Sequence, residues 1–295
     1  MNHVVSRLAL LLLVTASASA QSLPEGARAL RNLAYVANGH ERHKLDLYLP
    51  ANTNSPVPLI IWVHGGAWSA GSKERPPGLR FLSRGYAVAS INYRLSQHAV
   101  FPAQIEDCKA AVRWLRTHAS EYGLDPGRFG AWGASAGGHL VALLGTAGDV
   151  KEFDTGEHLE VSSRVQAVVD FFGPTDLLRM DEQLGDKGTF KHDAPDSPES
   201  RLLGGPLQEN KEKARRANPI PYVSAGDCPM LIVHGDADPL VPWQQSELLH
   251  EALKKAGVRS TLHLVKGGGH GTGFGPDVDK LVDEFFEQEL RQTRD

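Results

Sequence analysis

Short, nearly continuous apolar runs recur along the 295-residue chain, and longer segments with helical spacing of apolar residues separate them. Such runs are expected for parallel strands that helices cover on both faces. The expected strands are residues 57–63, 86–93, 128–133, 165–172, 230–233 and 260–265. The expected helices are residues 78–84, 102–118, a segment that opens at 139–144, 243–255 and 278–291. This alternation predicts an α/β fold with a mostly parallel, doubly wound sheet and helices on both faces.

Two segments depart from this alternation. Residues 44–49 alternate between apolar and polar and stop at Pro50, which indicates an early antiparallel strand. Residues 173–226 are rich in charge, Gly and Pro, and a connection of that length is usually a lid or a binding insertion. A solvated excursion over the surface is the alternative reading of the same composition. We treat residues 21–295 as a single domain that carries this insertion, because an alternating pattern of this length can form one doubly wound unit.

The first twenty residues have the pattern of an export signal. Arg7 precedes the apolar run 8–14, and small residues lead to the A-x-A pattern that ends at Ala20. The apolar run is shorter than the roughly 20 residues that a membrane anchor needs. We expect cleavage after Ala20, a secreted or periplasmic protein, and no membrane anchor.

Composition and cysteine content narrow the classes of partner only slightly. A formal net charge of −4 gives no reason to expect nucleic acid or an anionic membrane as partner. We expect the two cysteines, Cys108 and Cys228, to be buried free thiols, although an exported protein could pair them. No Cys or His cluster has the spacing of metal ligands, so neither a metal nor a cofactor is expected. The oligomeric state is not predicted.

The sequence Gly133-Ala134-Ser135-Ala136-Gly137 follows an expected strand and precedes an expected helix. A Ser in that position lies on a sharp turn with its hydroxyl exposed, and small flanking residues relieve the crowding. A glycine-rich helix start is the alternative for this element taken alone. The placement between strand and helix favours Ser135 as a nucleophile.

A nucleophilic hydroxyl needs a base, and the base needs a third group to orient it. His270 follows three glycines at the end of the last expected strand, where a turn can swing its ring over the carboxyl edge of the sheet. Asp236 and Asp238 both follow the strand that ends at Val233, and spacing alone does not decide between them as the orienting carboxylate.

A second glycine-rich loop, residues 63–68, leaves another buried strand. Its backbone N–H groups can turn toward a developing negative charge, together with the N–H of Ala136 after the nucleophile. Trp68, at the end of this loop, is expected to contribute to the wall of a substrate pocket, and a purely structural place in the core is the alternative.

These segments resemble the α/β-hydrolase esterases, and more narrowly the bifunctional feruloyl and acetyl-xylan esterase branch. The similar segments extend over most of the chain; they are residues 64–68, 105–116, 132–139, 197–206 and 234–242. The resemblance implies that Asp238, the last residue of the His-Gly-x-x-Asp pattern, partners His270. It also implies that Gly66, Ala67 and Ala136 donate to the oxyanion. Where related esterases have a third Gly, this chain has Ala67, which a backbone donor tolerates.

The expected function is hydrolysis of short acyl esters through an acyl-enzyme, with acetyl groups on plant polysaccharide as the target and feruloyl groups as the second candidate. The expected ligand is therefore a small-molecule or polysaccharide ester. Three alternatives share parts of the pattern: an arylformamidase-like hydrolase, a prolyl-oligopeptidase-like hydrolase, and a catalytically dead carbohydrate-binding protein on the same scaffold. The peptidases usually carry a large N-terminal propeller, and a dead relative usually lacks a triad member.

Overall fold

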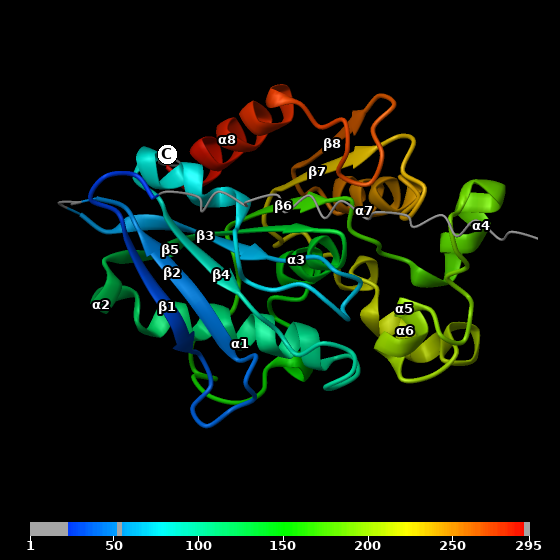
Figure 1. The fold of residues 1–295 in the computed structure, drawn as a ribbon, viewed down its shortest axis with the longest axis horizontal. Helices are drawn as coiled ribbons and strands as arrows, with labels where there is room; N and C mark the ends of the chain where they lie inside the picture. The colour runs from blue at the N-terminus through cyan, green and yellow to red at the C-terminus, as the bar shows by residue number, and fades with distance from the viewer. Residues whose placement is uncertain (1–22, 52–54, 292–295) are drawn as a thin grey trace, which may run out of the picture.

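The computed structural model describes residues 23–51 and 55–291, and within them eight strands form one sheet in the order β1-β2-β4-β3-β5-β6-β7-β8 (Figure 1). The strands are β1 (Arg28–Ala34), β2 (Lys44–Leu49), β3 (Val57–Val63), β4 (Ala87–Ile91), β5 (Leu124–Ala134), β6 (Ala167–Phe171), β7 (Met230–Gly235) and β8 (Ser260–Val265). Strands β4, β3 and β5 to β8 pair in parallel, whereas β2 pairs antiparallel with both β1 and β4. The predicted parallel sheet and the early antiparallel strand are confirmed. The predicted leader, residues 1–20, lies outside the described residues.

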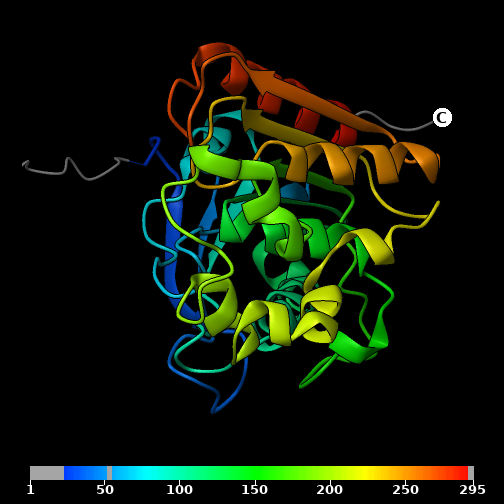
Figure 2. The same cartoon turned by 90° about the vertical axis from the view of Figure 1, so that its right-hand side faces the viewer.

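Helices cover both faces of the sheet, as the alternation predicts (Figure 2). One apolar cluster joins Ile61 of the sheet to α1 (Ala103–Thr117), α3 (Ala136–Thr146) and α7 (Gln244–Lys255). The other joins the adjacent Ile60, on the opposite face, to the 3-10 helix η1 (Pro77–Arg84) and to α8 (Pro276–Leu290). Alternate side chains of β3 therefore enter two separate cores, which explains why its run is apolar throughout.

Strand β1 is the strand that the pattern of apolar residues does not predict. Its seven residues are mostly exposed or half-buried, and Asn32 within it has a φ of 58°. The register against β2 shifts between Leu30 and Leu33, which marks an irregularity in the pairing. An exposed edge strand with such a bulge lacks the alternation that identifies strands from sequence.

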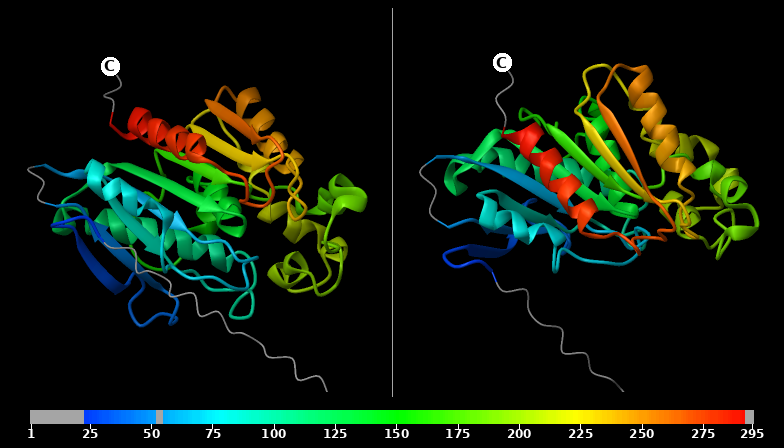
Figure 3. Two further views of the ribbon diagram at one scale, coloured as in Figure 1. Left: turned by 45° about the horizontal axis from the view of Figure 1, so that its top comes forward. Right: turned by 90° about the horizontal axis from the view of Figure 1, so that it is seen from above.

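The insertion, residues 173–226, is a set of short helices at one end of the sheet (Figure 3). These are η3 (Leu177–Arg179), α4 (Met180–Leu184), η4 (Gly185–Lys187), α5 (Pro198–Leu203), η5 (Leu207–Glu209), α6 (Lys211–Ala217) and η6 (Ile220–Tyr222). Leu177, Met180 and Leu202 are completely or almost completely buried in the larger apolar cluster. These residues anchor the insertion in the core, whereas most of residues 181–196 are exposed or half-buried. The role of the insertion as a lid or binding element stays a prediction.

Both cysteines are buried free thiols, which confirms that prediction. Cys108 lies within α1 and Cys228 lies two residues before β7. Burial raises the pKa of both thiols, so neither has the character of a nucleophilic thiolate. In the part of the chain that the structure describes, the helices are too short or too polar to cross a lipid bilayer.

Candidate active site

Ser135 occupies a strained turn between β5 and α3. Its φ of 57° and ψ of −123° are unfavourable for a residue with a side chain, and a turn this sharp projects the hydroxyl away from the sheet. The neighbouring glycines are required because a side chain at either position would clash with backbone atoms. A Cβ on Gly133 would lie 2.2 Å from the carbonyl oxygen of Gly137, and one on Gly137 would lie 2.1 Å from that of Val63. The local sequence is therefore dictated by the close approach of β3, β5 and α3.

The three predicted triad residues form one hydrogen-bonded chain. Nε2 of His270 lies 3.0 Å from Oγ of Ser135, although the two residues are 135 positions apart. Nδ1 of His270 lies 2.7 Å from Oδ2 of Asp238. The ring of His270 is partly accessible, whereas the side chain of Asp238 is fully buried. This is the arrangement in which an imidazole can take the Ser135 proton while the carboxylate holds the ring.

The turn that carries His270 depends on glycine. Gly267 and Gly271 have φ values of 68° and 72°, so both adopt the left-handed conformation. The ring of Phe172, directly after β6, lies 4.5 Å from the ring of His270, measured between centroids. The backbone of the turn and this aromatic contact together hold the imidazole over the carboxyl edge of the sheet.

Asp238 receives more hydrogen bonds than the sequence pattern indicates. Its Oδ1 accepts from the N–H groups of Leu240 and Val241, and Nε2 of His234 lies 3.3 Å from its Oδ2. Burial alone would raise the pKa of Asp238, but the hydrogen bonds from His234 and His270 hold it well below its usual range. The carboxylate is therefore charged at neutral pH.

Asp236 lies outside the hydrogen-bonded chain that contains Asp238. Its Oδ1 accepts from the N–H of Gly267, so it joins the turn after β7 to the turn that carries His270. Asp236 is exposed, in contrast to Asp238. The geometry thus separates the two carboxylates that spacing left open.

The loop after β3 presents unused backbone donors. Gly66, Ala67 and Trp68 all have positive φ, at 110°, 51° and 52°. Within the described residues, the N–H groups of Gly66, Ala67 and Ala136 donate to no protein acceptor. Unsatisfied N–H groups beside Ser135 are what an oxyanion hole requires. The predicted donors are therefore free for this role.

Two residues that the sequence analysis does not single out brace this loop. Arg42 donates to Nε2 of His64 (3.1 Å) and to the carbonyl oxygen of Gly71 (3.0 Å). Nδ1 of His64 in turn donates to the carbonyl oxygen of Gly65 (2.7 Å). Burial lowers the pKa of His64 to about 4, so the ring is neutral and can accept from Arg42. Arg42 follows β1, and no local pattern connects it with the loop.

Trp68 is both part of the pocket wall and part of the core, the two alternatives considered from sequence. It lines the pocket beside Ser135, yet its side chain is buried and only 2% of the residue is exposed. Its indole N–H donates to Nδ1 of His139 (3.2 Å), and Nε2 of His139 donates to the carbonyl oxygen of Ala217 (2.6 Å). Trp68 thus connects the oxyanion loop with α3 and the insertion.

A pocket of about 150 Å³ opens beside Ser135 and His270. Its walls include the loop after β3, residues 240–241 after Asp238, and part of the insertion. The insertion contributes Pro174, Phe190, His192, Pro198 and Glu199. A larger hollow of about 620 Å³ lies elsewhere and contains no triad residue, so the chemistry and not the volume identifies the site.

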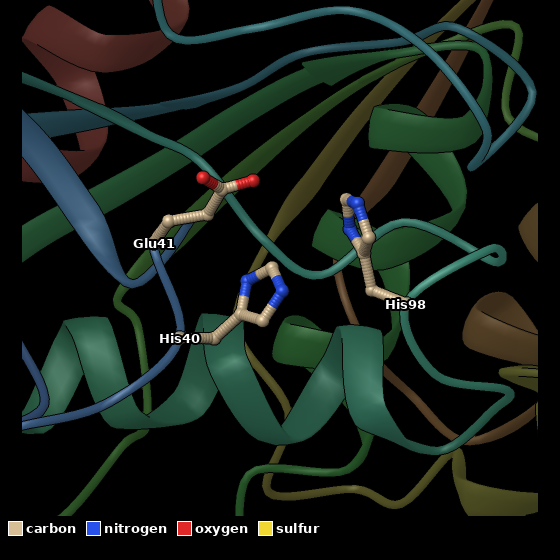
Figure 4. A group of neighbouring side chains, drawn as sticks. All are labelled: His40, Glu41 and His98. Atoms are coloured by element: carbon tan, nitrogen blue, oxygen red, sulfur yellow. The ribbon is translucent and has the colours of Figure 1, made fainter.

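His40, Glu41 and His98 form a group whose potential metal-ligating atoms lie within 4.8 Å of one another (Figure 4). Nδ1 of His40 accepts from the N–H of Arg42 (3.1 Å), and Nδ1 of His98 accepts from that of Leu95 (3.2 Å). A neutral imidazole that accepts at Nδ1 carries its proton on Nε2, so neither nitrogen offers a free lone pair. Histidines that bind metals normally donate their second N–H, the reverse of this pattern. We therefore assign no metal chemistry to the group.

Comparison with known proteins places the chain in a family. The sequence model of BD-FAE matches residues 45–253. The chain belongs to the BD-FAE family. A carbohydrate esterase from gut microbiota, solved in truncated form, is similar in structure with a TM-score of 0.82, at 35% identity over 91% of this chain and 99% of that one. Esterase 2 of Thermogutta terrifontis, solved after phosphorylation by paraoxon, is similar with a TM-score of 0.70, at 30% identity over 91% of this chain and 97% of that one.

Curated relatives of this BD-FAE family member are longer than the chain itself. A probable carboxylic ester hydrolase of Mycobacterium tuberculosis, LipM, is 31% identical over 76% of this chain and 51% of its own length. The chain spans about half the length of these curated relatives. The α/β-hydrolase fold expected from the resemblance is confirmed by the sheet topology and by these esterase structures.

Proposed function

We propose that the protein is a serine carboxylic-ester hydrolase that acts on short acyl esters, with acetyl groups on plant polysaccharide as its target. The observation that carries this proposal is the chain from Ser135 through His270 to Asp238, with distances of 3.0 and 2.7 Å, beside backbone N–H groups that have no protein acceptor. A nucleophile, an oriented base and free oxyanion donors are the complete set that acyl transfer requires.

The reaction begins when Oγ of Ser135 attacks the ester carbonyl and Nε2 of His270 accepts its proton. The carbonyl oxygen becomes an oxyanion, and the N–H groups of Gly66, Ala67 and Ala136 donate to it. His270 then gives the proton to the departing alkoxide, which leaves an acyl group on Ser135. A water molecule attacks this acyl-enzyme with His270 again as base, and the acid is released. Asp238 holds the ring of His270 and stabilises its cation through both stages.

The small pocket supports a short acyl group. A volume of about 150 Å³ takes an acyl group but not a polysaccharide chain, so the sugar part of such a substrate must remain outside as the leaving group. The structural relative from gut microbiota is a carbohydrate esterase, which supports the same substrate class. The leader pattern at residues 1–20 supports export to where plant polymers are met, and we propose a secreted or periplasmic location on that basis.

Replacement of Ser135 by Ala tests the function directly. We expect a loss in kcat on the order of a million-fold with p-nitrophenyl acetate, because the nucleophile and its base act as one unit. Retained turnover by a purified Ser135→Ala variant would refute the assignment. A fluorophosphonate probe should label the native protein and not the variant.

The substrate class is tested with a panel of acetylated xylan, acetylated pectin and methyl ferulate. Release of acetate from the polymers at a higher kcat/KM than release of ferulate supports the proposal. N-formylkynurenine and a dipeptidyl anilide added to the panel test the arylformamidase and peptidase alternatives. Preference for either of them would replace the polysaccharide proposal while leaving the Ser135 mechanism in place.

A further inference from the structure

A buried pair of ionisable side chains lines the otherwise largely apolar acyl pocket. His192 and Glu199 both belong to the insertion and both line the pocket beside Ser135. Their side chains are only 2% and 4% exposed. The proposed mechanism uses neither residue. Charged groups are rarely buried without a specific reason, so this pair requires an explanation of its own.

The hydrogen bonds of His192 indicate a protonated ring. Its Nδ1 lies 2.9 Å from Oε1 of Glu199, and its Nε2 lies 2.9 Å from the carbonyl oxygen of Leu240. A carboxylate and a carbonyl both accept, so each ring nitrogen must donate. Burial works against the charged ring, but the hydrogen bond and the charge of Glu199 outweigh it, and the pKa of His192 is raised. Asp181, which accepts from the backbone N–H of His192, adds a further favourable charge.

The pair is held firmly on several sides. His192 bridges the insertion to residue 240, whose N–H donates to the catalytic acid Asp238. The ring of Phe190 packs on that of His192, with 4.4 Å between centroids, and 39% of Phe190 is exposed at the pocket mouth. An entering group therefore cannot displace the imidazole without breaking contacts that also support the triad.

Glu199 retains an unused acceptor in this wall. Its Oε2 is buried and has no hydrogen-bond partner among the described residues. The wall formed by the pair is thus both charged and incompletely satisfied. The apolar tail of a long acyl group that pressed against this wall would strip the two ions of their remaining polar surroundings. The tail carries no hydrogen-bonding group that could replace those surroundings.

We propose that the His192–Glu199 pair determines the acyl-chain length that the enzyme accepts. The inference rests on the proposed esterase function. A short acyl group such as acetyl fills only part of the pocket of about 150 Å³, whereas a longer aliphatic acyl group must press against the ionised wall and is rejected. The pair acts on specificity by closing the pocket with charge, and it takes no part in proton transfer.

A double variant, His192→Leu with Glu199→Leu, tests this inference. An apolar replacement of similar volume removes both charges together, so no unpaired ion remains to unfold the protein. The readout is the ratio of kcat/KM for p-nitrophenyl hexanoate to that for p-nitrophenyl acetate. We expect this ratio to rise at least about tenfold, the scale of discrimination that a pocket achieves for a methylene group. We use a ratio because the double variant also loses the hydrogen bond from His192 to the carbonyl oxygen of Leu240. That loss can lower kcat/KM for every substrate alike, and the ratio cancels it.

Glu199→Gln and Gln208→Ala complete the experiment. Glu199→Gln keeps an acceptor for His192 but removes the charge of Glu199, so the ratio should rise by less than in the double variant. If the double variant does not fold, the ratio measured for Glu199→Gln tests the inference in its place. Gln208, also in the insertion, donates to Leu178 and Asp193 and does not line the pocket, so its replacement should leave the ratio unchanged. An unchanged ratio in the pair variants, with acetate still hydrolysed, would overturn this inference alone. A native protein that hydrolyses neither ester would overturn the proposed function.

Discussion

Nε2 of His234 lies 3.3 Å from Oδ2 of Asp238, the same oxygen that bonds to the ring of His270. The other nitrogen of His234 accepts from Oγ of Ser246 in α7 (2.7 Å), and Nε2 also donates to the carbonyl oxygen of Val241 (2.9 Å). His234 is completely buried. The carboxylate of Asp238 is therefore held by a second imidazole that does not line the pocket, so we assign His234 the part of a positioning residue.

Replacement of His234 by Gln should lower kcat for p-nitrophenyl acetate about 10- to 100-fold, because a hydrogen bond to a charged group contributes about 1.5–3 kcal/mol. KM should change little, since His234 does not line the pocket. His263→Gln, which alters another histidine on the neighbouring strand β8, is the matched control and should retain native turnover. Equal effects of the two replacements would show that His234 has no special role.

The two carboxylates after β7 should differ sharply. Asp238→Asn is expected to reduce kcat by on the order of 10⁴, because an amide cannot stabilise the His270 cation and favours the wrong tautomer. Asp236→Asn keeps an oxygen that can accept from Gly267, so its kcat should remain near the native value. Steady-state kinetics of both purified variants decide the matter. A comparable loss in the two would contradict the assignment of the acid.

Ala67→Gly should stabilise the protein and preserve its activity. Ala67 has a φ of 51°, and the left-handed conformation costs a residue with a Cβ roughly 1–2 kcal/mol. Gly removes this cost but loses more entropy on folding, so the net gain in the free energy of unfolding should be about 0.5–1 kcal/mol. Urea unfolding measures it, and p-nitrophenyl acetate hydrolysis tests whether the backbone donor still works. A less stable Ala67→Gly variant would show that the methyl group packs more favourably than its backbone costs.

Asp170 should make stability depend on pH. It is completely buried, its Oδ1 accepts from the N–H of Gly173 (3.0 Å), and burial raises its pKa to about 7. The folded state therefore holds a proton that the unfolded chain releases near pH 4. The contribution is fully present below the unfolded pKa of 3.8, and it is lost as pH rises through about 7. The total loss is on the order of 4 kcal/mol at most.

Asp170→Asn removes this titration while it keeps an acceptor for Gly173. The free energy of unfolding of the native protein, relative to that of the variant, should fall between pH 5 and pH 7 in urea titrations. Taking the difference cancels the opposite trend from Asp238, which is common to both proteins. A difference that stays constant with pH would mean that Asp170 is ionised in the folded state.

Local patterns in the sequence determined much of this structure. The apolar runs from residue 57 to residue 233 identify the inner parallel strands, because strands buried on both faces leave little room for polar residues. Ser135 stands out because glycines must flank so tight a turn, and His270 because glycines precede it after the last strand. Strand β1 escaped prediction because its edge position requires no apolar pattern.

Contacts between distant loops were decided only by the tertiary structure. Spacing left Asp236 and Asp238 equivalent, and they differ because the chain turns one carboxylate inward to His270 and the other outward to Gly267. The bond from Arg42 to His64 and the pair His192–Glu199 likewise leave no trace in local periodicity. Periodicity reports how each segment faces its core, whereas these partners meet through the packing of segments that are far apart along the chain.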